Sequence, residues 1–135
     1  MITNEATLAG LKEWHSLATA PDPERLAKLV REDAVFHSPV VHTPQEGREL
    51  VVGYLSAAAA TLGQNEFIYV REMVDGHDVL LEFSCVIDGI QVNGIDLIRF
   101  DDAGLIEDFK VMVRPLKAVN KVWDMMAAQL ERHKS

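Results

Sequence analysis

The second half of the chain consists of long runs of β-forming residues separated by short turns, and this pattern constrains the fold more than any other feature. The turns are Asp75-Gly76, Asp88-Gly89 and the Asp-Asp-Ala-Gly segment at 101–104. Asp-Gly between apolar runs is typical of tight β-hairpins. The spacing predicts a meander of four long, curved antiparallel strands over residues 66–74, 79–88, 90–101 and 105–115.

Helical periodicity dominates the first half. Leu8, Leu11 and Trp14 recur at helical spacing after an N-cap at Thr3 or Asn4, and the pattern continues to Ala18. Asp22 before Pro23 marks a second helix start. The remaining periodic segments predict a short strand over 34–38 and helices over 48–62 and 116–132. Helices followed by a meander predict one α+β domain over residues 1–135, with N-terminal helices packed on a strongly curved antiparallel sheet.

Composition excludes several function classes. The chain has 13 basic and 21 acidic residues and a net charge of -8, so it lacks the cationic surface that nucleic acid requires. No segment approaches the ~20 apolar residues of a membrane span, and Glu5 stands where a signal peptide needs a basic head. The single cysteine, Cys85, cannot form an internal disulfide, and the five histidines are scattered. We expect a cytoplasmic protein without metal, cofactor, nucleic acid or membrane partner.

Asp96 is the principal candidate for chemistry. Strand alternation places it in a row with Val92, Ile98 and Phe100, so a carboxyl group interrupts an otherwise apolar face. Desolvation raises the pKa of such a group, which can then act as a base or as a neutral hydrogen-bond donor in a cavity. The alternative is a structural aspartate bonded to Trp14, to a backbone amide or to a neighbouring side chain.

His37 and Ser38 are adjacent on the short strand, so only one of them can face the interior. His37 would be a general base at neutral pH, whereas Ser38 could only position a ligand unless a base activates it. The parity shared by Phe36 and Ser38 favours these two facing inward, with His37 at the surface or in an interface. We therefore predict Phe36 and Ser38 as ligand contacts and keep His37 as an alternative.

Three further side chains are candidates for ligand binding. Trp14 lies near the inward stripe of the first helix, where its indole N–H can donate into a pocket or its rings can fill the core. Tyr54 on the third helix offers a phenol or is a packing residue. Arg114, beside Pro115, binds an anionic group of a ligand or pairs with a neighbouring acid.

Three segments, 29–39, 94–101 and 104–108, together with the order of elements, resemble the nuclear transport factor 2-like superfamily and its SnoaL-like domains. The resemblance covers residues 4–130 and implies a cystatin-like cone with a cavity, assembled as a homodimer. The outward apolar residues Ile95 and Leu97 also call for a cover. This scaffold carries isomerases, cyclases, dehydratases, epoxide hydrolases and non-catalytic binding domains, so the fold alone does not select an activity.

The ketosteroid isomerase branch of this superfamily offers a residue-level comparison. The resemblance aligns Asp96 with the neutral aspartate of that branch, Trp14 with its helical tyrosine and Ser38 with its carboxylate base. A serine cannot replace that base. Two hypotheses follow: the cavity binds a small, largely apolar organic molecule with proton transfer by Asp96, of isomerase, cyclase or dehydratase type, or the domain is a non-catalytic ligand-binding or dimerisation module.

Overall fold

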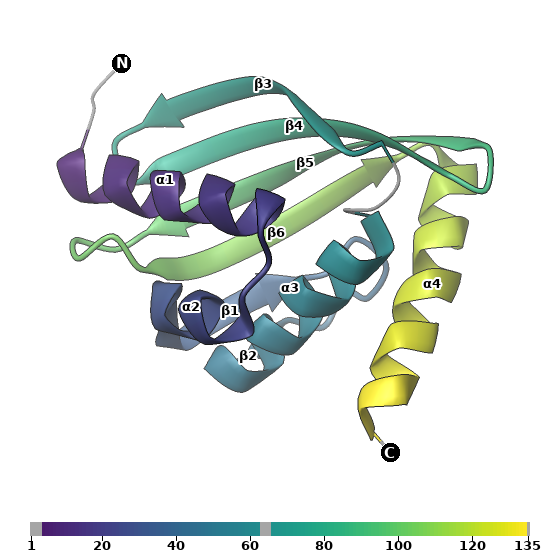
Figure 1. Cartoon of the computed structure of the whole chain (residues 1–135), viewed down its shortest axis with the longest axis horizontal. Coiled ribbons are helices and arrows are strands. Elements are labelled where there is room, and N and C mark those ends of the chain that lie inside the picture. Colours follow the sequence, from purple (N-terminus) through teal and green to yellow (C-terminus); the bar gives the residue numbers. More distant parts are fainter. Residues whose placement is uncertain (1–3, 63–65, 135) are drawn as a thin grey trace.

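The computed structural model describes residues 4–62 and 66–134, and it confirms the predicted α+β cone (Figure 1). The helices of the described part are α1 (Glu5–Thr19), α2 (Pro23–Leu29), α3 (Arg48–Leu62) and α4 (Leu116–Lys134). Its strands are β1 (Val30–His37), β2 (Gln45–Glu46), β3 (Ile68–Asp75), β4 (Asp78–Ile87), β5 (Ile90–Phe100) and β6 (Ile106–Arg114). The four meander strands and the helices begin and end within a few residues of the predicted positions.

The strands form one sheet in the order β2-β1-β6-β5-β4-β3. The meander is antiparallel, and the turn between β4 and β5 has positive φ at both Asp88 and Gly89, as a two-residue type I′ hairpin requires. The pairing of β1 with β6 is parallel, so the sheet is mixed, whereas the sequence predicted an antiparallel sheet. A long crossover through α3 and the meander separates these two strands in sequence, which makes parallel pairing accessible.

Strand β1 begins at Val30, directly after α2, earlier than the predicted start at Ala34. The start of the strand was not predicted because charged residues such as Arg31 and Asp33 are typical of a solvent-exposed loop. In the structure Arg31 donates hydrogen bonds to Asp33 and to Glu107 of β6, so the charges are paired along the strand.

Two side-chain caps fix the helix starts. The Asn4 side chain accepts a hydrogen bond of 3.0 Å from the backbone N–H of Thr7, so Asn4 is the N-cap of α1. The alternative cap, Thr3, lies outside the described residues. The Asp22 carboxylate accepts from the backbone N–H groups of Glu24 and Arg25, and Pro23 occupies the first turn of α2.

Helix α1 lies across the concave face of the sheet, and two glycines permit its close approach (Figure 1). A Cβ atom on Gly10 would lie 2.4 Å from the carbonyl oxygen of Gly104 and 2.7 Å from the Phe100 ring. A Cβ on Gly104, whose φ is 81°, would lie 2.5 Å from the carbonyl oxygen of Ala6. Only glycine fits at this contact between the helix and the β5–β6 turn.

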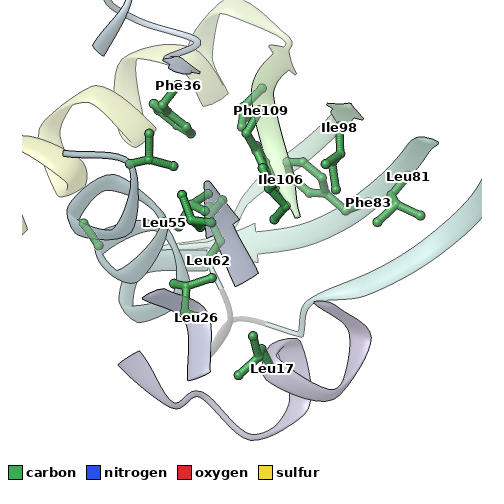
Figure 2. Close-up of a cluster of buried hydrophobic side chains, with 14 of the residues drawn as sticks. Leu17, Leu26, Phe36, Leu55, Leu62, Leu81, Phe83, Ile98, Ile106 and Phe109 are labelled. Carbon is green, nitrogen blue, oxygen red and sulfur yellow. The ribbon is translucent and has the colours of Figure 1, made fainter. Parts of the chain in front are cut away.

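The hydrophobic core lies between the concave face and the helices (Figure 2). Its largest fully buried side chains include Phe36, Phe83, Phe100 and Phe109, one each from β1, β4, β5 and β6. Inward and outward residues alternate along β4 and β5, as the period of a half-buried strand predicts. No helix in the described residues is both long and apolar enough to cross a membrane.

Candidate functional site

A cavity of about 500 Å³ lies inside the cone, between the concave face and the helices. This volume is within the usual range of small-molecule sites, roughly 300–1,000 Å³. Every helix and the strands β1, β3, β4, β5 and β6 contribute to its wall. Exposed lining residues lie on the last turn of α1, in the α1–α2 connection, at the start of α2 and near the end of α3: Ala18, Thr19, Pro21, Pro23, Ala59 and Ala60. The cavity therefore opens between the ends of α1 and α3.

Aromatic rings form much of the inner wall. Phe109 packs against Trp14 with ring centroids 5.0 Å apart, and Phe67 stacks on Phe83 at 5.1 Å. Gly94, the cross-strand partner of Phe83, makes room for that ring: a Cβ there would lie 2.5 Å from its Cζ atom. The missing side chain on β5 thus lets the Phe83 ring lie flat beside the cavity.

One chain of hydrogen bonds ends at the buried acid. The Trp14 indole N–H donates to the Tyr69 hydroxyl over 3.1 Å, and the Tyr69 O–H donates to Oδ2 of Asp96 over 2.7 Å. Asp96 is 6% exposed, and all three side chains line the cavity. The other carboxyl oxygen, Oδ1, has no hydrogen-bond partner among the described residues. Asp96 therefore keeps unused bonding capacity beside the cavity.

Burial determines the protonation state of the Asp96 carboxyl group. Desolvation raises the pKa of the Asp96 carboxyl to about 7, and the hydrogen bond from Tyr69 opposes the increase. Burial and the neighbouring Asp96 carboxylate also raise the pKa of the Tyr69 phenol far above its ordinary value. Near neutral pH, Asp96 is thus present in comparable amounts as acid and as carboxylate, whereas Tyr69 stays protonated. Such a carboxyl group can both accept and donate a proton.

The structure brings some of the predicted site residues together and separates others. Trp14, Phe36 and Asp96 line the cavity. Ser38 is not part of the wall, although its neighbour Pro39 is, and its hydroxyl accepts a hydrogen bond from the backbone N–H of Val40. Tyr54 also lies outside the wall and stacks on the back of Phe36 with centroids 5.1 Å apart. The assignment of Ser38 and Tyr54 to ligand binding stays a prediction.

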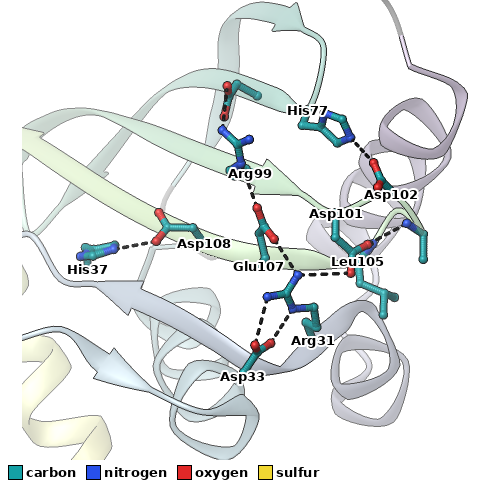
Figure 3. Close-up of polar contacts among 12 residues, drawn as sticks. Arg31, Asp33, His37, His77, Arg99, Asp101, Asp102, Leu105, Glu107 and Asp108 are labelled. Carbon is teal, nitrogen blue, oxygen red and sulfur yellow. Dashed lines mark hydrogen bonds and ion pairs between the residues drawn. The ribbon is translucent and has the colours of Figure 1, made fainter.

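His37 and Arg114 lie outside the cavity wall. His37 forms a 2.8 Å contact with Oδ1 of Asp108 on the adjacent strand β6 (Figure 3). Arg114 is exposed, and its guanidinium donates a 3.4 Å hydrogen bond to Asn93 on β5. Neither contact connects to the Asp96 cluster.

Tyr69 is the hydrogen-bond partner of Asp96 that the sequence analysis missed. By alternation, Ile68 and Val70 fall on one face of its strand and Tyr69 and Met73 on the other, so apolar residues occupy both faces and alternation alone does not reveal which face is inward. The available signal was the pair Phe67 and Tyr69, two aromatic residues two positions apart. A register shift follows Tyr69 in the pairing with β4, which ends the simple alternation there.

The described residues place a buried carboxyl group on the cavity wall, and they contain no cluster of three or more His, Cys, Asp or Glu side chains that could hold a metal ion. The only carboxyl groups on the described wall are Asp96, deep in the cavity, and Asp22, beside its mouth. Asp22 is engaged in capping α2. The arrangement can therefore bind an apolar molecule and exchange a proton with it at a single carboxyl oxygen, Oδ1 of Asp96.

Solved structures with this architecture include proteins of related sequence. A steroid delta-isomerase from Pseudomonas aeruginosa is 38% identical with a TM-score of 0.90, over 95% of this chain and 93% of that one. A cystatin-like-fold protein from Silicibacter pomeroyi is 31% identical with a TM-score of 0.83, over 90% and 85%. A structure from Jannaschia sp. CCS1, named for a SnoaL-like polyketide cyclase, shares the fold alone at 11% identity and a TM-score of 0.67, over 87% and 94%.

None of the curated proteins matches the chain. The sequence model of the SnoaL-like domain matches residues 11–109, which include the C-terminal part of α1, the aromatic wall from Phe36 to Phe109, Tyr69 and Asp96. This match spans well over half of the chain, and the cone, its cavity and the related structures agree with it. The chain therefore belongs to the SnoaL-like domain family.

Proposed function

We propose that the cavity binds a small, largely apolar organic molecule and that Asp96 transfers a proton to or from it, in a reaction of isomerase, cyclase or dehydratase type. The observation that carries the proposal is Oδ1 of Asp96, a carboxyl oxygen beside an apolar cavity that has no hydrogen-bond partner among the residues the structure describes. Trp14 and Phe36 contact the ligand, and Tyr69 positions the carboxyl group. The whole chain acts as one domain and needs no cofactor.

The proton cycle uses one oxygen. In the ionised form, Oδ1 removes a proton from an acidic C–H bond of the ligand, and the electron pair of that bond enters the conjugated system of the ligand. The neutral acid then returns the proton to another atom. A pKa near 7 favours both steps, because proton transfer is most efficient when the group titrates near the working pH. The Tyr69 O–H holds Oδ2 throughout and so fixes the direction of Oδ1.

The first test uses 5-androstene-3,17-dione, because a relative that is 38% identical is a steroid delta-isomerase. Formation of the conjugated ketone is followed by its ultraviolet absorbance. We expect protein-dependent conversion that falls at least ~100-fold in Asp96→Asn, the size of a lost acid–base group. Asp22→Asn is the matched control, since it removes the other wall carboxyl and keeps a good helix cap. Conversion that survives Asp96→Asn would show that Asp96 is not the proton carrier.

The second candidate is a non-catalytic ligand-binding or dimerisation module. The position of Ser38 favours it, because Ser38 cannot supply a carboxylate base and its hydroxyl is engaged with Val40. Native mass spectrometry of the freshly purified protein, followed by denaturing extraction, identifies any bound molecule. A ligand that binds at fixed stoichiometry but is returned unchanged supports this candidate. A product that depends on the protein contradicts it.

We also propose a homodimer formed through the convex face of the sheet. Ile95 lies beside the exposed Met112 there, and Leu97 lies two residues along β5. Burial of this apolar surface supplies the driving force. Sedimentation equilibrium at micromolar concentration should give twice the monomer mass, and Leu97→Asp should give the monomer. Lys28→Asp, at an exposed position of α2, is the control that should stay dimeric. A monomeric wild type would exclude the dimer.

Charge and burial support a proposal for the location and the other partners of the protein. A net charge of -8 disfavours nucleic acid, and Cys85 is a buried free thiol. Burial also raises the pKa of this thiol to about 11, which keeps it protonated and unreactive. We propose a cytoplasmic protein whose partners are its ligand and a second copy of itself.

A further inference from the structure

The charge of the cavity wall is of one sign. No lysine, arginine or histidine is among its described residues, whereas Asp22 and Asp96 are. An anionic ligand would have to bury its charge beside Asp96 without a counter-ion, which is expensive in a nonpolar site. The wall therefore selects against carboxylates and phosphates.

The polar end of the cavity is also short of donors. The Trp14 N–H already donates a hydrogen bond to Tyr69, and the Tyr69 O–H donates one to Asp96. When Asp96 is ionised, this end presents acceptors only. A carboxylate can accept about four hydrogen bonds, and here it receives one from the described residues. The unused acceptor capacity of Oδ1 suits a hydrogen-bond donor carried by the ligand.

The apolar part of the wall favours positive charge as well. Six aromatic side chains line the cavity: Trp14, Phe36, Phe67, Tyr69, Phe83 and Phe109. Aromatic faces attract ammonium groups, and the attraction grows when the cation is removed from water. The net charge of -8 adds a long-range attraction for cations.

We propose that the cavity binds apolar amines in their protonated form, with the ammonium group on Oδ1 of Asp96 and the hydrocarbon body against the aromatic wall. The proposal rests on the binding half of the proposed function. It adds a ligand class that the proton-transfer scheme does not require. Ammonium ligands pair with the carboxylate form of Asp96.

The test compares three probes with one hydrocarbon body: 2-naphthylmethylamine, 2-naphthalenemethanol and 2-naphthoate. Affinities are measured by isothermal titration calorimetry at pH 8, where Asp96 is mainly ionised and the amine is protonated. We expect the amine to bind at least ~10-fold more tightly than the alcohol, as a charge-assisted hydrogen bond exceeds a neutral one. The naphthoate should bind most weakly.

Two measurements assign the preference to Asp96. In Asp96→Asn the amine should lose its advantage while the alcohol keeps its affinity. Asp33→Asn removes the same charge at an exposed position outside the cavity wall and should leave both affinities unchanged. In the wild type, the affinity of the amine should rise several-fold from pH 6 to pH 8 as Asp96 ionises through about pH 7. The pH profile needs no variant, so it remains decisive if Asp96→Asn folds poorly.

The outcomes separate the two proposals. Alcohol or naphthoate binding as tightly as the amine at pH 8 would overturn the ammonium proposal while cavity binding stands. An amine preference that persists in Asp96→Asn would place the ammonium group elsewhere and would also overturn it. If none of the three probes binds at millimolar concentration, the ammonium proposal fails, and the steroid assay decides separately on proton transfer.

Discussion

On the concave face of the sheet, Asp96 receives one hydrogen bond, from Tyr69, and lines a cavity wall without a described cation. On the convex side, Glu107 of the neighbouring strand contacts two arginines, with Arg99 at 2.8 Å and Arg31 at 2.6 Å (Figure 3). Both acids lie on strands of the same meander. One is buried with little compensation, and the other is partly exposed and paired.

The difference shows what each face contributes. The pairs around Glu107 are solvent-accessible and contribute little each, so they mainly suit the strands to water. Ionisation of Asp96 destabilises the folded state, because the carboxylate is desolvated without a counter-charge. The concave face therefore sacrifices stability at one residue, and the aromatic packing around it must compensate.

The largest effect is expected from the aromatic packing itself. Phe109 is 1% exposed and contacts both Trp14 and Phe36. Phe109→Ala should lower the free energy of unfolding by roughly 3–5 kcal/mol, measured by urea denaturation. Met112→Ala, on the convex side of the same strand, should cost less than ~0.5 kcal/mol in a monomer. A larger, concentration-dependent cost for Met112→Ala would mean that the convex face is also buried, by a second copy.

The second effect is a pH dependence of stability at Asp96. Its pKa rises from 3.8 to about 7 on folding, so the unfolded chain releases this proton first and wild-type stability falls between about pH 4 and pH 7. The full difference corresponds to about 4 kcal/mol at ~1.4 kcal/mol per pKa unit. Asp96→Asn does not titrate and should gain on the wild type over this range. Urea denaturation at pH 4 and pH 8 measures it; a constant difference between the two proteins would refute the raised pKa.

Steric room on the concave face gives the third effect. A Cβ at Gly94 would meet Phe83 and, at 2.6 Å, the backbone oxygen of Met112. Gly94→Ala should therefore cost ~1–3 kcal/mol and displace the Phe83 ring, which thermal unfolding and near-ultraviolet circular dichroism would detect. Gly53→Ala in α3 has open space around the new methyl group and should be neutral or stabilising. Equal behaviour of the two variants would contradict the tight contact at Phe83.

The smallest effect has the opposite sign to that of Asp96. The hydrogen bond from Arg31 lowers the pKa of the exposed Asp33 carboxyl below its ordinary value. Its contribution to stability is therefore present above the unfolded pKa, near pH 4, and is lost as the pH falls through the lower folded value. Asp33→Asn should be slightly less stable than the wild type at pH 7 and equal to it in strong acid. Urea titrations at both pH values test this sign.

The sequence allowed most of the fold to be predicted, because the strong signals are local. Asp-Gly turns delimit the meander, and Asn4 and Asp22 mark two helix starts. Strand β1 was predicted too short because pairing of Arg31 with Glu107 depends on residues far apart in the chain. Strand β2 has only two residues and no periodicity to detect.

The candidate site could be predicted only where its signal is local. Asp96 stands out within its own strand as the polar residue of an apolar row. Tyr69 does not, because its contact with Asp96 depends on the register of three strands: Tyr69 lies opposite Phe83, and Phe83 lies opposite Gly94. The tyrosine must extend diagonally past Phe83 to the acid two residues beyond Gly94.

The contact between Gly10 and Gly104 acts as a mechanical stop for α1. It sets the height of the helix above the sheet, and Trp14 follows one turn later on the same helix, ~6 Å along its axis. A side chain at Gly10 would raise this end of the helix and carry the indole away from Tyr69. A substitution at Gly10 would therefore change the size of the cavity although Gly10 does not line it. Design or natural variation could use this position to alter the cavity without changing the chemical groups inside.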